Sequence, residues 1–274
     1  MIQKVIRQSL VSLLVFVAVL FAFSRVDWME LFGLHRSIIE EKLGDVYWEL
    51  FSQSETFIDD EALTAPLDSL LSTLCRANGM ERDEVSLHLV ECDEVNAYAC
   101  PGNHLVVYTA LIDSCRNAEE LCGVLAHELA HIERGHVMQK LIKEMGIAAL
   151  AAMVGGNGGT EALAEVMRIL SSTAYDRTLE SEADRLAVDY LLRADVNPRP
   201  FGEFLLRLAE EEDLPSLAEW ISTHPDSKKR SQLICDRADR EAGKHAYLRL
   251  MTNDEWEAYR QAVSEKKEAH SDFD

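Results

Sequence analysis

The chain has 274 residues, enough for one sizeable domain with extensions or for two small domains. Hydrophobic residues make up 47% and charged residues 27%, which supplies a packed core and excludes a wholly disordered protein. The formal net charge is −21, so the surface repels the phosphates of nucleic acids, and nucleic acid is not an expected partner.

The first 27 residues carry a membrane signal. Lys4 and Arg7 precede an uncharged run from Gln8 to Ser24. The run reaches the lower edge of the ~17–25 residues that span a bilayer, and its basic flank places the N-terminus inside. We therefore expect a single-pass membrane anchor, with the remaining chain on the extracytoplasmic (periplasmic) side. The alternative is a signal peptide cleaved after Ala22-Phe23-Ser24, which would give a secreted or periplasmic protein.

The next part of the chain mixes helices and short strands. Residues 28–60 are predicted to form an amphipathic, acidic helical linker region. Pro66 is predicted to open a second helix over Leu67 to Arg76. The turn sequence Cys100-Pro-Gly-Asn103 joins the last two of three predicted strands. These strands cover Val85–Val90, Val95–Ala99 and His104–Thr109.

Helices dominate the rest of the sequence. A long helix begins at Ala118, where Asn117 and Glu120 form a capping-box pattern. Residues 243–274 are predicted to be a charged, loosely held C-terminal tail. The expected fold class is α+β, mainly helical, with one small β-sheet. The later helices are expected at about 161–175, 178–194, 200–212, 215–222 and 226–242.

The six cysteines include no C-x-x-C pair, so they are not expected to bind a metal. Cys92 and Cys100 flank a turn-like segment and form the first disulfide to test. Buried free thiols are the alternative.

The main chemical motif is His127-Glu-Leu-Ala-His131, inside the long helix. Its two histidines are one turn apart on the same face, which lets both imidazoles reach one metal ion. Glu128 follows the first histidine, in the position of a general base. Val124 lies on the same apolar stripe, so both histidines face inward, where two unpaired imidazoles would be costly to bury. The motif therefore predicts a zinc site rather than two core histidines.

A third histidine ligand nearby does not fit the spacing. One class of zinc peptidases needs a glycine and a histidine where this chain has Arg134 and Val137. His136 lies about 140° round the helix from His131. It is expected either at the surface or in contact with a metal-binding residue, without binding the metal itself. Glu180 and Asp184 offer another solution, because they are four residues apart on one helical face. Glu180 can bind zinc while Asp184 accepts the free N–H of a ligand histidine.

Three motifs together resemble a known family. They are His127-Glu-Leu-Ala-His131, Glu180-x-x-Ala-Asp184 and Thr223-His-Pro225. They resemble the zinc metalloendopeptidase family of the CAAX prenyl endopeptidase, HtpX and BepA. Asn96-Ala-Tyr-Ala99, followed by Pro101-Gly102, is similar to that family's segment before the zinc helix. The similarity covers about residues 60 to 235.

The resemblance implies a zincin-like core and one Zn²⁺ per chain, held by His127, His131 and Glu180, with Glu128 as base. It also implies that His224 approaches the metal, where it would polarise the developing oxyanion or cap the zinc at rest. An ordinary loop histidine is the alternative for His224. The chain departs from multi-spanning members in having one anchor, and from the BepA type in lacking a helical-repeat extension.

The substrate is expected to bind in an extended form. A peptide would pair through backbone hydrogen bonds with the strand formed by Asn96, Ala97, Tyr98 and Ala99. The alternative is an ordinary core strand.

The predicted function belongs to residues 61–242, the metallopeptidase domain. We expect a metalloendopeptidase that hydrolyses peptide bonds in unfolded or misassembled proteins near a membrane, in protein quality control. One alternative is a membrane-tethered, zinc-containing chaperone or adaptor without turnover, in which four protein ligands close the site. An intramembrane protease is disfavoured by the single spanning segment. The natural substrate and the oligomeric state do not follow from the sequence.

Overall fold

The computed structural model describes residues 36–154, 160–172, 174–211 and 214–271. Two compact units are present, Met1–Glu40 and Glu41–Asp274, and the candidate site lies in the second. The predicted membrane anchor, residues 1–27, lies outside the described ranges. Within those ranges, no helix combines the length and the apolar character that crossing a membrane requires.

The sheet has three strands, β1 (Ser86–Val90), β2 (Ala97–Cys100) and β3 (His104–Tyr108), in the order β1-β3-β2. β3 pairs in parallel with β1 and antiparallel with β2. Gly102 and Asn103 take positive φ angles of 78° and 59°, which closes the short connection between β2 and β3. The predicted α+β class with one small sheet is therefore confirmed, although β2 begins two residues later than expected.

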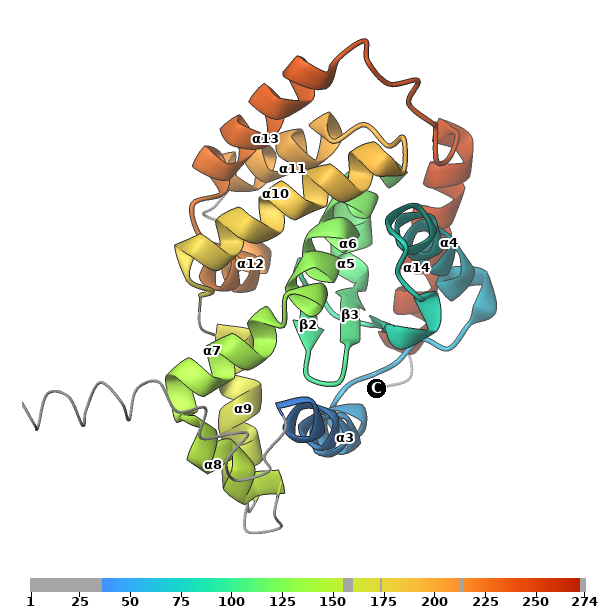
Figure 1. Ribbon diagram of the computed structural model, residues 1–274. Helices are drawn as coiled ribbons and strands as arrows, with labels where there is room; N and C mark the ends of the chain where they lie inside the picture. The colour runs from blue at the N-terminus through green and yellow to red at the C-terminus, as the bar shows by residue number, and fades with distance from the viewer. Residues whose placement is uncertain (1–35, 155–159, 173, 212–213, 272–274) are drawn as a thin grey trace, which may run out of the picture. The chain divides into compact units, whose positions relative to one another are not determined.

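Helices make up most of the described chain (Figure 1). The zinc-motif helix α6 packs against β2, α4, α10 and α11. Gly123 allows the close approach to α11, because a Cβ atom there would lie 2.3 Å from Cβ of Phe201. The α-helices are α3 (Arg36–Ser54), α4 (Glu61–Asn78), α5 (Thr109–Ser114), α6 (Ala118–Glu133), α7 (His136–Met145), α8 (Ile147–Ala152), α9 (Thr160–Ser172), α10 (Arg177–Arg193), α11 (Arg199–Glu210), α12 (Ala218–Thr223), α13 (Ser227–Glu241) and α14 (Asn253–Ser271), with short 3-10 turns η1 (Arg82–Glu84) and η3 (Pro215–Leu217).

The start of α4 differs from the prediction. The helix begins at Glu61, where the Asp60 side chain accepts a 3.1 Å hydrogen bond from the backbone N–H of Ala62. Pro66 therefore lies inside the helix and does not open it. A good N-cap and the burial of Leu63 outweigh the backbone hydrogen bond that the proline cannot make.

The expectation of a loosely held C-terminal tail was wrong. Residues 253–271 form α14, which packs against α4 and α5. Trp256, Tyr259 and Val263 recur at helical spacing and are buried. The Trp256 indole donates to the carbonyl of Cys115 at 3.3 Å, and the Tyr259 hydroxyl donates to the carbonyl of Leu63 at 3.0 Å.

All six cysteines lie in the described ranges and are free thiols. The disulfide suggested for Cys92 and Cys100 is not formed. Cys100 is buried, with its Sγ 3.5 Å from the hydroxyl of Tyr47.

The part of α3 after Glu40 packs on the sheet. A Cβ atom on Gly44 would lie 2.6 Å from Cα of Gly102, so the helix meets the β2–β3 connection backbone to backbone. Trp48 stacks on His88 and His104, with ring centroids 3.8 Å and 4.5 Å away. The two histidines share a 2.9 Å hydrogen bond. A titratable pair therefore lies under this helix.

Candidate active site

The zinc-motif helix presents two buried histidines. Its first turn is capped by Asn117, whose side chain accepts from the N–H of Glu120 at 2.9 Å. His127 and His131 are fully buried, and their Nε2 atoms lie 3.1 Å apart. The predicted i, i+4 spacing therefore brings the two rings to one point.

Helix α10 brings a carboxylate to the same point. The Asp176 side chain caps this helix by accepting from the N–H of Thr178. Glu180 lies one turn inside, and its Oε1 is 3.3 Å from Nε2 of His131. Its Oε2 is 3.7 Å from Nε2 of His127. The structure thus joins residues separated by about fifty positions in the chain.

His224 completes the cluster from the connection between α12 and α13. Its Nδ1 lies 3.1 Å from Oε1 of Glu180 and 3.4 Å from Nε2 of His127. Its Nε2 lies 3.5 Å from Oε1 of Glu128. His224 is fully buried, which does not fit an ordinary exposed loop histidine.

These donors fit a zinc ion. Four residues each offer one ligand atom, and these four atoms all lie within 4.8 Å of one another. Imidazole nitrogens with a carboxylate oxygen are a typical zinc donor set. Burial lowers the pKa of His127 to about 3, which keeps that imidazole neutral and able to bind a metal. The cluster consists of His127, His131, Glu180 and His224.

Glu128 faces the cluster from the side of the sheet. The backbone N–H of Ala99 donates a 3.1 Å hydrogen bond to its Oε2, while its Oε1 has no hydrogen-bond partner among the described residues. Burial raises the pKa of Glu128 to about 7, even though His131 opposes the shift. A carboxyl group with this pKa can take and release a proton near neutral pH.

Asp184 lies behind the first histidine. Its Oδ1 is 3.1 Å from Nδ1 of His127, the ring atom that points away from the cluster. Burial alone would raise the pKa of Asp184, but Arg230 and His127 lower it to about 2. The ionised carboxylate can therefore accept the Nδ1–H and leave Nε2 free for a metal.

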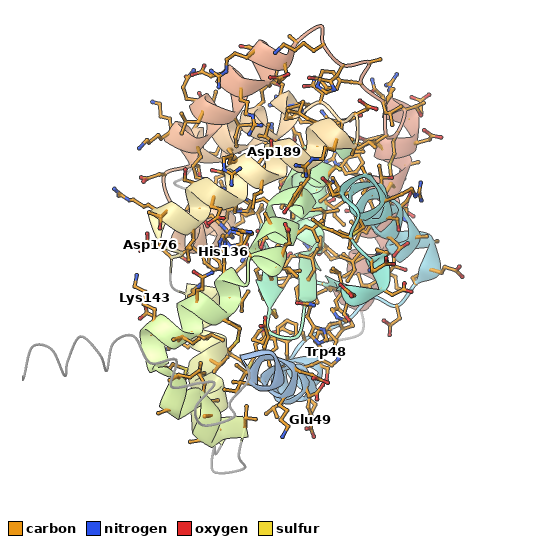
Figure 2. The ribbon with its side chains drawn as sticks, in the orientation of Figure 1. Trp48, Glu49, His136, Lys143, Asp176 and Asp189 are labelled. Carbon is orange, nitrogen blue, oxygen red and sulfur yellow. The ribbon has the colours of Figure 1, made fainter. Side chains whose placement is uncertain are left out.

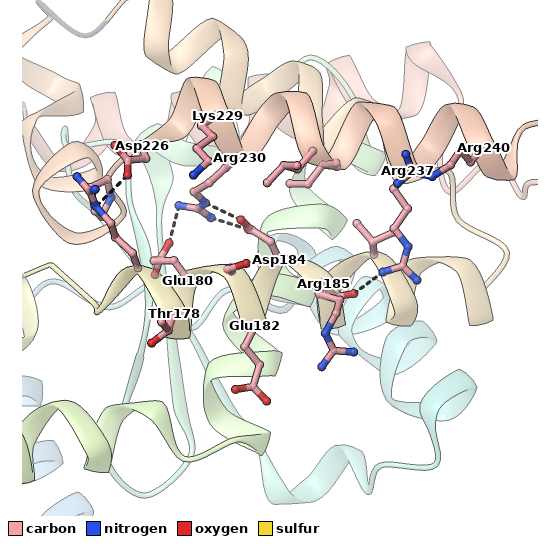
Figure 3. Close-up of a pocket in the computed structure, with 16 residues that line it drawn as sticks. Thr178, Glu180, Glu182, Asp184, Arg185, Asp226, Lys229, Arg230, Arg237 and Arg240 are labelled. Atoms are coloured by element: carbon pink, nitrogen blue, oxygen red, sulfur yellow. Dashed lines mark hydrogen bonds and ion pairs between the residues drawn. The ribbon is translucent and has the colours of Figure 1, made fainter.

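Arg230 was not identified from the sequence. Its Nε and Nη2 each donate a 2.8 Å hydrogen bond to Asp184, and its Nη1 lies 2.5 Å from Oε2 of Glu180 (Figure 3). Arg230 is 5% exposed, and together with His224 it holds the pKa of Glu180 well below its usual range against the effect of burial. Two lysines precede Arg230 in the sequence, so nothing local distinguished it from a solvated basic run.

His136 lies nearer the site than a continuous helix would place it. Gly135 takes a φ of 60°, which ends α6 and turns the chain into α7. His136 is consequently buried at the start of α7, with Nδ1 3.1 Å from Nδ1 of His131 (Figure 2). Of the two expectations for His136, contact with a proposed metal-binding residue is confirmed and a surface position is wrong. The glycine before it was the available signal.

The predicted substrate strand, β2, lies at the edge of the described sheet. Asn96 accepts from Tyr108 in the direction of β3, whereas the N–H of Ala99 points to Glu128. By the alternation of an antiparallel ladder, Ala97 and Ala99 direct their backbone groups away from β3. The strand is buried along its length, and it runs beside the general-base candidate.

Known proteins share this domain. The model of peptidase family M48 matches residues 61–238. A beta-barrel assembly-enhancing protease of Yersinia pestis is 29% identical over 217 residues, covering 73% of this chain and 44% of its own length. The mitochondrial metalloendopeptidase OMA1 of Bos taurus is 25% identical over 217 residues, covering 72% of this chain and 41% of its own length. The chain thus spans less than half the length of these curated relatives. Because the family model covers well over half of its residues, this chain belongs to peptidase family M48.

Proposed function

We propose that the chain is a zinc-dependent metalloendopeptidase that binds one Zn²⁺ through His127, His131 and Glu180. The observation that carries the proposal is the convergence of two imidazole nitrogens from α6 with a carboxylate from α10. The names of the M48 relatives, protease and metalloendopeptidase, support the same activity.

The reaction divides between the metal and the protein. A bound zinc ion supplies Lewis-acid activation of a carbonyl and of water. Glu128 takes the proton of the attacking water and returns it to the leaving amine. The Ala99 N–H holds one oxygen of this carboxylate, so the other oxygen keeps its direction toward the reacting atoms. Asp184 holds His127 in the tautomer that binds metal.

We propose that His224 caps the site in the resting enzyme. Its Nδ1 lies among the donor atoms, where it would occupy the coordination position that water needs. Movement of the Thr223-His-Pro225 segment would open that position, and His224 could then donate to the developing oxyanion.

We propose that the substrates are unfolded or misassembled proteins near a membrane. Ala97 and Ala99 direct their backbone groups away from β3, which supports pairing of an extended peptide with this edge, and such pairing is tolerant of substrate sequence. A beta-barrel assembly-enhancing protease among the relatives supports a role in protein quality control. Anchoring through residues 1–27, with the domain on the extracytoplasmic side, belongs to the same proposal.

The test is zinc analysis followed by proteolysis of casein. We expect one zinc per chain and casein cleavage by the wild-type protein, and zinc without cleavage in Glu128→Gln. A zinc-loaded wild-type protein that leaves casein and reduced, unfolded proteins intact would contradict the proposal.

The second candidate is a zinc-containing adaptor, favoured by the position of His224 as a fourth donor. A structural site is closed by four protein ligands, whereas a catalytic site keeps one position open. Cobalt spectra separate the two. If His224→Ala changes neither the cobalt spectrum nor turnover, His224 is not a ligand. If the spectrum changes and neither protein cleaves, the adaptor is favoured.

A further inference from the structure

A second feature of the molecule lies between α10 and α13, next to the cluster of His127, His131, Glu180 and His224. A groove of about 570 Å³ separates the two helices (Figure 3). Its floor includes Glu180, Asp184 and Arg230, whose ion pairs occupy all three side chains. The groove therefore borders the candidate active site.

The walls of this groove are basic in a strongly acidic protein. Six of the 27 lysines and arginines line it, against four carboxylates, while the whole chain carries a formal charge of −21. Arg177 pairs with Asp226, and Arg237 pairs with Asp189. Lys229 and Arg240 have no carboxylate within ion-pair distance in the described part of the chain. The groove thus keeps two positive charges that no carboxylate of the described residues neutralises.

An apolar side chain lies between these two charges. Leu233 lines the groove and is 55% exposed, the largest exposed fraction among the large hydrophobic side chains described. Lys229 and Leu233 are four residues apart on α13, and Arg240 follows seven residues later, so all three fall along one side of the helix. Figure 3 shows Lys229 and Arg240 well apart along α13, with Asp226 beyond Lys229. The groove therefore offers an apolar contact between two positive charges, which is complementary to a peptide with an apolar side chain between two carboxylates.

The spacing along α13 defines what would fit. Lys229 and Arg240 are separated by about 16 Å at ~1.5 Å per helical residue. An extended peptide covers this distance with about five residues at ~3.3 Å each. Because alternate side chains of an extended segment share a face, an apolar side chain over Leu233 would have one carboxylate two positions away toward Lys229. The other carboxylate would lie four positions away toward Arg240, where the long side chains take up the remaining difference in length.

We propose that the α10–α13 groove binds an extended acidic peptide segment, with carboxylates on Lys229 and Arg240 and an apolar side chain on Leu233. The carboxylates would replace water around two unpaired cations and would be attracted by the local positive potential. The interaction requires no turnover, so it stands or falls separately from the peptidase assignment.

The experiment measures fluorescence anisotropy of a labelled peptide with the core Glu-Ser-Leu-Ser-Ser-Ser-Glu, and of the same core in reverse order. The binding protein is the full chain carrying Glu128→Gln, which prevents cleavage. We expect one of the two orders to bind and to weaken as salt rises, because exposed ion pairs are screened. Replacing both glutamates by lysine, or the leucine by serine, should lower the affinity about tenfold or more, equivalent to ~1.4 kcal/mol.

Charge reversal on the protein supplies the matched control. The double variant Lys229→Glu, Arg240→Glu should lose about tenfold or more in affinity, and Leu233→Ser should also lose affinity. The single variant Lys229→Glu should lose affinity as well. Lys228→Glu makes the same kind of change one residue away, outside the groove, and should change affinity less than about threefold. Circular dichroism and zinc content establish that each variant is folded. Equal losses in Lys228→Glu and Lys229→Glu would indicate only long-range charge and would overturn the proposal, as would wild-type binding by the double variant.

Discussion

The backbone N–H of Ala99 donates a 3.1 Å hydrogen bond to Oε2 of Glu128. This contact joins the edge strand β2 to the zinc-motif helix α6, two elements that the sequence separates by a turn, a strand and a short helix. A peptide paired to the edge of β2 would therefore lie beside the carboxylate that is expected to act as base. The proposed substrate strand and the proposed catalytic group thus lie side by side.

Replacing Glu128 by Gln should abolish turnover and keep the metal. The amide retains the volume of the side chain but cannot accept a proton, so we expect a loss in kcat of about a hundredfold or more. Wild-type kcat should fall in acid, because Glu128 must be ionised to act as a base and burial raises its pKa to about 7. A bound cation would move this acid limb to lower pH.

Glu133→Gln is the matched control for Glu128→Gln, because Glu133 is an exposed glutamate at the end of the same helix. It should retain nearly all activity. Full activity in Glu128→Gln with zinc bound would rule out Glu128 as the base.

Replacing Asp184 by Asn should weaken zinc binding by about ten- to a hundredfold. The carboxylate accepts the Nδ1–H of His127, and a neutral amide holds that tautomer less firmly. Competition with a chelator measures the affinity. Asp189→Asn, on the same helix and paired with Arg237 outside the cluster, should leave the affinity unchanged. Equal zinc affinity in wild type and Asp184→Asn would mean that the contact does not orient the ligand.

Replacing Arg230 by Met should destabilise the metal-free protein by about 3–5 kcal/mol. The change leaves the carboxylates of Glu180 and Asp184 buried without their cation. Urea unfolding in a chelator measures the loss. Saturating zinc should restore part of the stability, since a metal bound to Glu180 replaces some of the missing positive charge.

Arg237→Met is the control for Arg230→Met, because it removes a guanidinium two turns further along α13. Its ion pair with Asp189 is partly exposed, so the expected loss is at most about 1 kcal/mol. Similar losses in both variants would show that burial does not increase the contribution of the Arg230 ion pairs to the free energy of unfolding.

The sequence predicted the parts of the site that depend on spacing within one helix. The two histidines of α6 and the Glu180–Asp184 pair of α10 follow from the i, i+4 rule, and the structure brings both pairs together. Their convergence required the resemblance to a family, because spacing says nothing about where two helices cross.

The features that the sequence missed depend on packing between distant segments. Arg230 sits in a basic run, and only the meeting of α13 with α10 makes it a buried partner of two carboxylates. His136 changed position because Gly135 bends the backbone, an effect that helical periodicity cannot express. Residues 253–271 looked like a solvated tail because their charge outweighs an apolar stripe that only a neighbouring helix reveals.

The histidine pair beneath α3 should make stability depend on pH between about 7 and 5. Burial, with a smaller effect of His104, lowers the pKa of His88 to about 4. Burial also lowers the pKa of His104, although Asp45 on α3 opposes the shift. The unfolded chain takes up protons below about pH 6.5, where the folded pair does not. Stability is therefore complete above that pH and falls as the solution becomes more acidic, by about 1–2 kcal/mol after allowing for solvent screening.

Urea unfolding at about pH 7 and about pH 5 measures this dependence. Glu128, His127 and His136 also bind different numbers of protons in the folded and unfolded chain over this interval, and comparison with a variant that keeps them removes their contribution. The double variant His88→Gln, His104→Gln removes both titrating rings, so the difference between the two pH values should shrink by that amount. His245→Gln removes a histidine that does not contact Trp48 and should leave the difference unchanged. The double variant also alters the surface on which Trp48 stacks, but that loss is the same at both pH values and cancels in the comparison. If wild type and the double variant lose equal stability on acidification, protonation of this pair does not control the packing of α3.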